Sequence, residues 1–252
     1  MTPVEVNYTI EGPQGAPALV LSHSIGSSSD MWLSQRAVLS AEYRVISYDH
    51  RGHGKSPVPQ GPYQVSDLAG DVLALLDRLG IEKAHFCGLS LGGAVGMWLS
   101  RFRPHRIDQL VLACTSAWFA PKEVWDERAE RVRAEGMEWL ADFSLGRWLT
   151  KDFDPHEAAN VRAMIASTPA DGYINCCAAL GEWDFADELP QIPTPTLIIA
   201  GAEDPATPPE HARQIAARIP RSRVVVLDGA AHLANVERPV EFNDLLRAHL
   251  LG

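Results

Sequence analysis

Short apolar runs alternate along this chain with longer segments whose apolar residues recur at helical spacing. Continuous apolar runs bounded by turn residues are typical of strands that are covered on both faces of a sheet. The pattern predicts strands at Glu5–Ile10, Ala18–Ser22, Arg44–Tyr48, Ala84–Cys87, Gln109–Ala113, Thr196–Ala200 and Arg223–Leu227. It predicts helices at Val65–Leu79, Leu91–Arg101, Pro209–Arg218 and Val240–Leu250. This alternation indicates an α/β fold with a mostly parallel, doubly wound sheet.

The alternation stops between residues 117 and 190, where helical runs rich in Trp, Arg and Glu occur without a convincing strand. Three prolines, Pro190, Pro193 and Pro195, then return the chain to the sheet. We interpret residues 117–190 as a helical cap above the carboxyl ends of the strands, with helices packed on the sheet edge as the alternative. Residues 1–116 and 191–252 form the core, and core and cap are expected to fold as one unit.

Composition limits the possible partners of the protein. The 252 residues are 46% hydrophobic, which is enough for one sizeable core. The net charge of −10 comes without any basic block, which argues against nucleic acid or a membrane surface as a partner. A small anionic substrate stays compatible with this charge, because one local arginine outweighs a diffuse field. No apolar run is long enough to cross a bilayer and the first residues do not resemble a signal peptide, so we expect a cytoplasmic location.

The four cysteines, Cys87, Cys114, Cys176 and Cys177, show no spacing typical of metal ligands. We therefore expect neither a metal, a cofactor nor a disulfide. The vicinal pair at 176 and 177 is interpreted as packing rather than redox chemistry, because reactive thiols need exposed surroundings that lower their pKa.

Candidate chemistry begins at Gly88-Leu89-Ser90-Leu91-Gly92, which follows an apolar strand and precedes a helix. A serine on such a sharp strand-to-helix turn is strained, and its neighbours need to be small. The start of the following helix directs partial positive charge toward an oxyanion above the serine. Ser90 is therefore a candidate nucleophile, although the G-x-S-x-G pattern also occurs by chance in glycine-rich loops.

A serine nucleophile needs a base and an orienting carboxylate at the carboxyl ends of later strands. Among nine histidines, His232 is the one in the loop that follows the last predicted strand. The preceding strand leads into Glu203 and Asp204, and we prefer Asp204 because it is shorter and is restrained by the next residue, Pro205. The order Ser, Asp, His is that of the α/β-hydrolase arrangement.

The oxyanion of an acyl-transfer reaction also needs two donors. One candidate is the backbone N–H of Leu91, directly after the nucleophile. The other is the backbone N–H of Ile25, in the loop after the Ala18–Ser22 strand, where Gly26 allows the chain to turn inward.

Four segments of the chain resemble the 3-oxoadipate enol-lactonases, bacterial α/β-hydrolases of aromatic catabolism (the β-ketoadipate pathway). These segments are residues 47–56, 85–93, 172–179 and 231–237. The Asp-x-Arg-Gly-His-Gly-x-Ser motif from Asp49 to Ser56 and the Ser90 motif are shared with many relatives. More particular are His85-Phe86-Cys87-Gly88-Leu89-Ser90 and Cys176-Cys177-Ala178-Ala179 in the cap. The resemblance runs nearly end to end, and the chain departs from it where the usual first strand before Glu5–Ile10 is short or missing.

The resemblance implies hydrolysis of an enol-lactone that bears an acetate side chain, giving 3-oxoadipate. A carboxylate on the substrate calls for a cation in the cap, which offers Arg128, Arg131, Arg133, Arg147 and Lys151 among Trp118, Trp125, Trp139 and Trp148. We expect Trp148, Arg133 and Trp118 to contact the substrate, with solvated helix faces as the alternative for any single arginine.

Two other functions remain open at this point. The first is a different serine hydrolase on the same scaffold, such as a carboxylesterase, a carbon–carbon bond hydrolase or a perhydrolase, because the cap determines specificity. The second is a ligand receptor that keeps a slow triad; turnover separates it from an enzyme.

Overall fold

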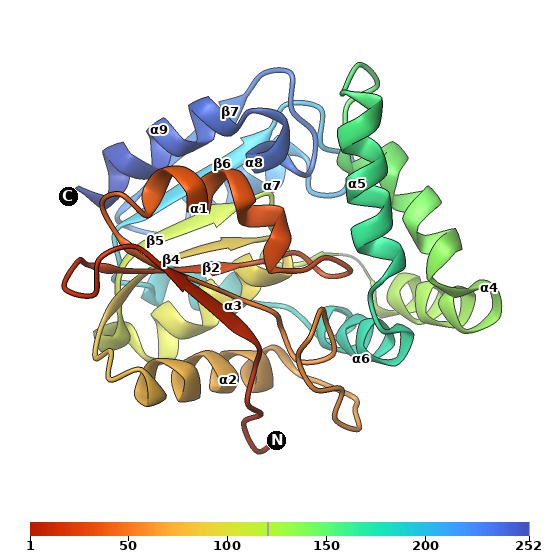
Figure 1. Cartoon of the computed structure of the whole chain (residues 1–252), viewed down its shortest axis with the longest axis horizontal. Coiled ribbons are helices and arrows are strands. Elements are labelled where there is room, and N and C mark those ends of the chain that lie inside the picture. The colour runs from red at the N-terminus through yellow and green to blue at the C-terminus, as the bar shows by residue number, and fades with distance from the viewer. Residues whose placement is uncertain (120, 252) are drawn as a thin grey trace.

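A single seven-stranded sheet forms the centre of the computed structural model, which describes residues 1–119 and 121–251 (Figure 1). Its strands are β1 (Tyr8–Glu11), β2 (Ala18–Ser22), β3 (Arg44–Tyr48), β4 (Ala84–Leu89), β5 (Ile107–Ala113), β6 (Thr196–Gly201) and β7 (Ser222–Leu227). They lie in the order β1-β3-β2-β4-β5-β6-β7. β1 runs antiparallel to β3 and all other pairs are parallel. The sheet confirms the α/β fold with a mostly parallel, doubly wound sheet that the sequence predicts.

The central strands are apolar because helices cover them on both faces. All residues of β4 and β6 are buried, whereas β1 at the edge is only partly buried. The register places Leu21 opposite Cys87, and Cys87 opposite Val111, so that adjacent strands end at the same edge of the sheet. The loops that follow β2, β4, β6 and β7 therefore come together at that edge.

Helices pack on both faces of the sheet, with α1 and α9 above it and α2 and α3 below it in the view of Figure 1. The α-helices outside the segment between β5 and β6 are α1 (Leu33–Leu39), α2 (Val65–Arg78), α3 (Leu91–Phe102), α7 (Pro209–Ala216), α8 (Ala234–Glu237) and α9 (Pro239–Leu250). Short 3-10 helices occupy Ser29–Trp32, Pro104–Arg106 and Ala186–Gln191. The α1 helix was not expected from the sequence, since only two of its residues, Gln35 and Leu39, are buried.

Three helices follow β5 before the chain returns to β6: α4 (Lys122–Trp148), α5 (Pro155–Ala166) and α6 (Ala170–Gly181). Figure 1 shows them beside the sheet, beyond the carboxyl ends of the parallel strands. We call this helical segment the cap. An isolated bridge between Trp118 and Asp184 joins the two chain segments at its base. Within α4, Gly136 adopts φ 80° and ψ −178°, which kinks the helix and changes the direction of its second half.

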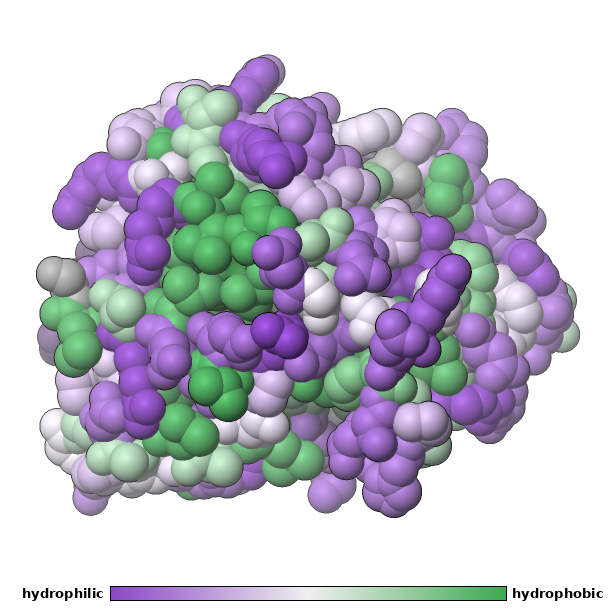
Figure 2. Space-filling view, turned by 90° about the horizontal axis from the view of Figure 1, so that it is seen from above, coloured by the Kyte–Doolittle hydropathy of each residue, from purple (hydrophilic) through white to green (hydrophobic). Residues whose placement is uncertain are grey.

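The molecule carries an apolar area on the side away from the cap. Figure 2 shows this area, bordered by hydrophilic residues, on the face seen from above. β7, the last strand of the sheet, and α9 lie on this side and carry Val224 and Val240, which are 36% and 67% exposed. In the described part of the chain, no helix is long and apolar enough to cross a membrane.

Candidate active site

Ser90 lies on the turn between β4 and α3 in a strained conformation, with φ 57° and ψ −112°. Such a conformation is unfavourable for a residue with a side chain by about 1–3 kcal/mol and persists where the surroundings impose it. Its N–H donates to the Ala113 carbonyl, and its own carbonyl accepts from the Thr115 hydroxyl at 2.7 Å. The Ser90 side chain makes no capping bond to α3 and lines a cavity below the cap.

Two glycines allow this turn to pack. A Cβ atom at Gly88 would lie 2.1 Å from the carbonyl oxygen of Gly92, and one at Gly92 would lie 2.2 Å from the carbonyl oxygen of Ser22. Both distances are far below van der Waals contact, and backbone atoms cannot move aside cheaply. The glycine spacing around Ser90 is therefore a steric requirement of this turn.

His232 and Asp204 meet in loops that leave β7 and β6. The Nδ1 atom of His232 lies 2.8 Å from Oδ2 of Asp204, and both side chains are buried. Asp204 also accepts hydrogen bonds from the Ala206 N–H, the Thr207 N–H and the Thr207 hydroxyl. Glu203, the alternative acid, is exposed and lies outside the cavity that contains Ser90 and His232.

These contacts keep Asp204 ionised. Burial raises the pKa of this carboxyl, but the His232 ring and the hydrogen bonds from Thr207 outweigh burial and lower the pKa to about 2. The ionised Asp204 accepts a hydrogen bond from the Nδ1–H of His232. Nε2 of His232 is then the ring nitrogen that can take a proton. Ser90 and His232 line the same cavity, so the arrangement has the parts needed for a serine and a base.

The backbone N–H groups of Ile25 and Leu91 are available as donors. Among the residues that the structure describes, neither N–H donates a hydrogen bond. Ile25 lines the cavity together with Ser90, and the adjacent Gly92 N–H donates to the His23 carbonyl at 3.1 Å. That bond fastens the loop after β2 to the first turn of α3. The two predicted oxyanion donors therefore lie on segments that are joined directly to each other.

A buried histidine supports the loop that carries Ile25. The Gly26 N–H donates to Nε2 of His53 at 2.9 Å, and Nδ1 of His53 lies 3.3 Å from the Arg51 carbonyl. Burial and the neighbouring His23 lower the pKa of His53 to about 3, so the ring is neutral at pH 7. The neutral ring with its proton on Nδ1 satisfies both contacts. The place of His53 in a turn motif of the sequence did not indicate that it supports the loop of Ile25.

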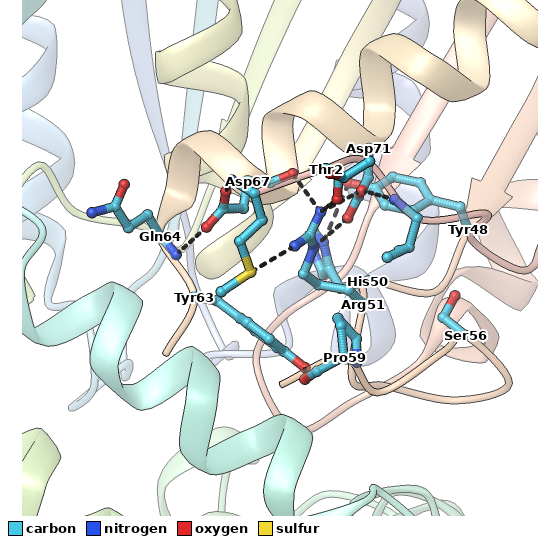
Figure 3. A network of polar contacts seen from close by, with 12 residues as sticks. Thr2, Tyr48, His50, Arg51, Ser56, Pro59, Tyr63, Gln64, Asp67 and Asp71 are labelled. Atoms are coloured by element: carbon cyan, nitrogen blue, oxygen red, sulfur yellow. Dashed lines mark hydrogen bonds and ion pairs between the residues drawn. The ribbon is translucent and has the colours of Figure 1, made fainter. Parts of the chain in front are cut away.

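An ion pair holds the turn that carries His53. Arg51 is fully buried and forms two bonds of 2.6 Å with the carboxylate of Asp71 on α2. Figure 3 shows the guanidinium between α2 and the first residues of the chain, where it also contacts the carbonyls of Thr2 and Asp67. The two hydrogen bonds between guanidinium and carboxylate hold both side chains in one orientation. The loop after β3 is thus fixed at the back of the site.

The walls of the cavity come largely from the cap. Trp148, an expected contact, lines it and packs with its ring centroid 5.8 Å from that of His232. Tyr173 on α6 lines it beside Gly26. Sequence reasoning did not single out Tyr173 or Phe143, a further lining residue, because a lone aromatic residue in a helix has no chemical signature.

Two arginines of α4 face this cavity without a carboxylate partner. Arg128 lies 4.7 Å from the ring centroid of Trp125, and the Arg147 guanidinium donates to the Pro205 carbonyl at 3.1 Å. Both stack against Phe143, and neither forms an ion pair within the described part of the chain. Burial and the charge of Arg128 lower the pKa of Arg147. Two cations close to each other make the site attractive to an anion.

Two of the expected cap contacts, Arg133 and Trp118, lie outside the cavity. Arg133 is exposed, and Trp118 is 49% exposed beside a separate surface hollow. The cavity lining, as described, includes neither of them. Arg133 precedes the kink at Gly136 and lies on the solvent face of α4, while Trp118 lies at the base of the cap. The cysteines are all buried and unbridged, which agrees with their interpretation as packing residues.

Known proteins share this arrangement of fold and sequence. The model of the alpha/beta hydrolase fold family matches residues 17–239. The chain is 40% identical over 248 residues to 3-oxoadipate enol-lactonase 2 of Acinetobacter baylyi, covering 97% of this chain and 92% of that protein. A Pseudomonas syringae protein named for carbamate hydrolysis, RutD, is 33% identical over 246 residues, covering 93% and 94%.

A solved structure gives the same assignment. The crystal structure of the enol-lactonase from Burkholderia xenovorans LB400 superposes with a TM-score of 0.96 at 40% identity, covering 99% of this chain and 97% of that one. Similarity of this extent includes the sheet, the cap and the loops of the cavity. The chain therefore belongs to the α/β-hydrolase family, as a hydrolase similar to the 3-oxoadipate enol-lactonases.

Proposed function

We propose that this enzyme hydrolyses 3-oxoadipate enol-lactone to 3-oxoadipate in the catabolism of aromatic compounds. The observation that carries the proposal is the cavity itself, in which Ser90 and His232 face Arg128 and Arg147. A lactone with an acetate side chain offers a carbonyl to the first pair and a carboxylate to the second. Similarity to two enol-lactonases supports the same substrate.

In the first half of the reaction, the Ser90 hydroxyl attacks the lactone carbonyl while Nε2 of His232 takes its proton. The Ile25 and Leu91 N–H groups stabilise the oxyanion that forms, and a single donor of this type contributes about 3–4 kcal/mol to lowering the barrier. Asp204 holds the His232 ring and stabilises its positive charge. The bond between the carbonyl carbon and the ring oxygen then breaks, and His232 returns the proton to the leaving enol.

The second half of the reaction releases the acyl group from Ser90. The leaving enol is still attached through the carbon chain, and it becomes a ketone by moving its proton to carbon. Water gives a proton to His232 and attacks the acyl carbonyl, and the same two N–H groups hold the second oxyanion. Collapse of that intermediate returns the proton to Ser90 and yields a product with two carboxylates.

Arg128 and Arg147 supply the site for the acetate carboxylate in this proposal. An arginine in an apolar wall binds a carboxylate strongly, because both groups lose water and the guanidinium offers two parallel donors. Trp125, Phe143 and Trp148 form that wall. The same apolar wall discriminates only weakly against large or uncharged acyl groups. We therefore expect the charges of the two arginines to determine most of the substrate selectivity.

The test is turnover by the purified protein. We expect rapid conversion of 3-oxoadipate enol-lactone, slower hydrolysis of the neutral ester 4-nitrophenyl acetate, and loss of both activities in the Ser90→Ala variant. Lactone turnover no faster than ester turnover would reject the substrate while leaving a serine hydrolase, including an esterase or a carbamate hydrolase. Binding of the lactone without turnover would indicate a receptor instead of an enzyme.

A further inference from the structure

The last turn of cap helix α4 touches the loop that carries His232. The Leu233 N–H donates to the Trp148 carbonyl at 3.0 Å, and the Trp148 ring packs against the His232 ring. His232 is thus flanked by cap residues on one side and by Asp204 on the other. The position of the cap and the position of this histidine are therefore linked through the backbone.

One carboxylate joins the same two segments a second time. Oε1 of Glu237 accepts hydrogen bonds from the N–H of Thr150 at 2.7 Å and from its hydroxyl at 2.6 Å. Oε2 of Glu237 accepts from the N–H of Ala231, the residue before His232, at 2.6 Å. Thr150 lies two residues after the end of α4, so three donors from the cap and the histidine loop converge on one side chain.

Glu237 has no competing cation in the described structure. Its neighbour Arg238 pairs with Glu241 instead, and the Glu237 side chain is half-buried. Hydrogen bonds to a charged acceptor are shorter and stronger than those between neutral groups. The loop before His232 needs such a restraint, because it contains Gly229 in a left-handed conformation (φ 65°), and both Asp228 and Gly229 are exposed.

From these contacts we infer that Glu237 is a positioning residue, which fastens the His232 loop to the end of the cap so that the base keeps its place between Asp204 and the cavity. The inference rests on the proposed function, since it takes His232 as the base. Glu237 contacts neither Ser90 nor the cavity, and its effect on the reaction passes through Ala231 and Thr150. It acts on every substrate, whether or not the substrate touches the cap.

The Glu237→Gln variant separates this role from simple stabilisation. Glutamine keeps one acceptor oxygen but presents an amide N–H₂ to a donor on either Ala231 or Thr150, so one of the two segments loses its bond. We expect kcat to fall about tenfold for both the enol-lactone and 4-nitrophenyl acetate, with a smaller change in KM. The rate at which an organophosphate labels Ser90 should fall by a similar factor, because that step also requires the base.

Glu241→Gln is the matched control, since it removes a partly exposed carboxylate four residues along the chain, whose ion-pair partner among the described residues is Arg238. It should leave kcat, KM and the labelling rate unchanged. Thr150→Val removes a single donor, the Thr150 hydroxyl, and is the variant to use if Glu237→Gln folds poorly. Its effect on kcat should be smaller than that of Glu237→Gln, and the double variant should show less than the product of the two effects.

A merely structural role would lower the melting temperature of the Glu237→Gln and Thr150→Val proteins while their kcat and labelling rates at 25 °C stay at the parent values. That result would overturn the inference. Failure of the proposed function looks different: the Ser90→Ala protein would keep its ester activity, or the parent would not be labelled at Ser90 at all.

Discussion

Replacing Arg128 by methionine tests how the cavity recognises charge. Methionine keeps an unbranched apolar stem against Trp125 and Phe143 but removes the guanidinium, which has no carboxylate partner in the described structure. Arg147 is a less clean target, because its bond to the Pro205 carbonyl supports the loop of Asp204. The decrease in activity of the Arg128→Met variant should therefore mainly reflect the lost interaction between the guanidinium and the substrate.

The magnitude follows from the kind of bond that is lost. A hydrogen bond to a charged partner contributes roughly 1.5–3 kcal/mol, which corresponds to a decrease of roughly 10- to 150-fold in kcat/KM for the enol-lactone. Because the carboxylate is bound before and during the reaction, most of the decrease should come from a higher KM. Hydrolysis of the neutral 4-nitrophenyl acetate should change by less than about threefold, because a substitution away from the reacting atoms has a small effect on them.

The assay compares kcat/KM for the two substrates in the parent and in three variants. Arg128→Met and Arg147→Met should both lower the ratio of lactone to ester activity. Arg133→Met is the control, because Arg133 lies on the same helix but is exposed and outside the cavity. A ratio that stays constant in the first two variants, or that falls in the Arg133 variant, would show that Arg128 and Arg147 do not bind the substrate carboxylate.

Three further predictions concern the parts around Ser90. Asp204→Asn should lower kcat by roughly 10³- to 10⁴-fold, while Glu203→Gln stays within about twofold; the opposite result in steady-state kinetics would show that the other carboxylate orients the base. The lowered pKa of Asp204, about 2 against an ordinary value of 3.8, contributes about 2 kcal/mol of stability that is full above pH 3.8 and is lost as pH falls through 2. Urea unfolding of parent and Asp204→Asn proteins between pH 7 and pH 2 should show that the difference in stability shrinks, and a constant difference would contradict the assignment. His53→Leu should lower kcat about tenfold by releasing the Gly26 N–H, and His53→Gln, which keeps an acceptor, should recover part of the loss; equal losses in both variants would speak against a role in holding the loop.

The sheet could be predicted closely because its strands are defined by local pattern. Ala18–Ser22 and Arg44–Tyr48 have the predicted bounds, since each is an apolar run between turn residues. The edge strand at Tyr8–Glu11 is shorter and lies later than expected, because the residues before it pair with side chains such as Asp71 and Ser56 instead of with a strand. Where a strand is only partly buried, the hydrophobic pattern alone does not determine where the strand begins and ends.

The cap was predicted as a helical segment, but its chemistry was not. Five cations were visible in the sequence, and nothing local distinguishes Arg133 from Arg128. They are five residues apart in the same part of α4 and so lie on different faces of the helix, and the packing of the cap determines which face meets the cavity. The roles of His53 and Glu237 are likewise tertiary, because each bonds to a backbone group on another segment of the chain.

The most direct measurement of the central claim is a crystal structure of the Ser90→Ala variant soaked with 3-oxoadipate enol-lactone. We expect the lactone carbonyl oxygen to lie within hydrogen-bond distance of the Ile25 and Leu91 N–H groups, with the acetate carboxylate on Arg128, Arg147 or both. A lactone bound with its carboxylate toward solvent, or with its carbonyl away from those two N–H groups, would contradict this expectation.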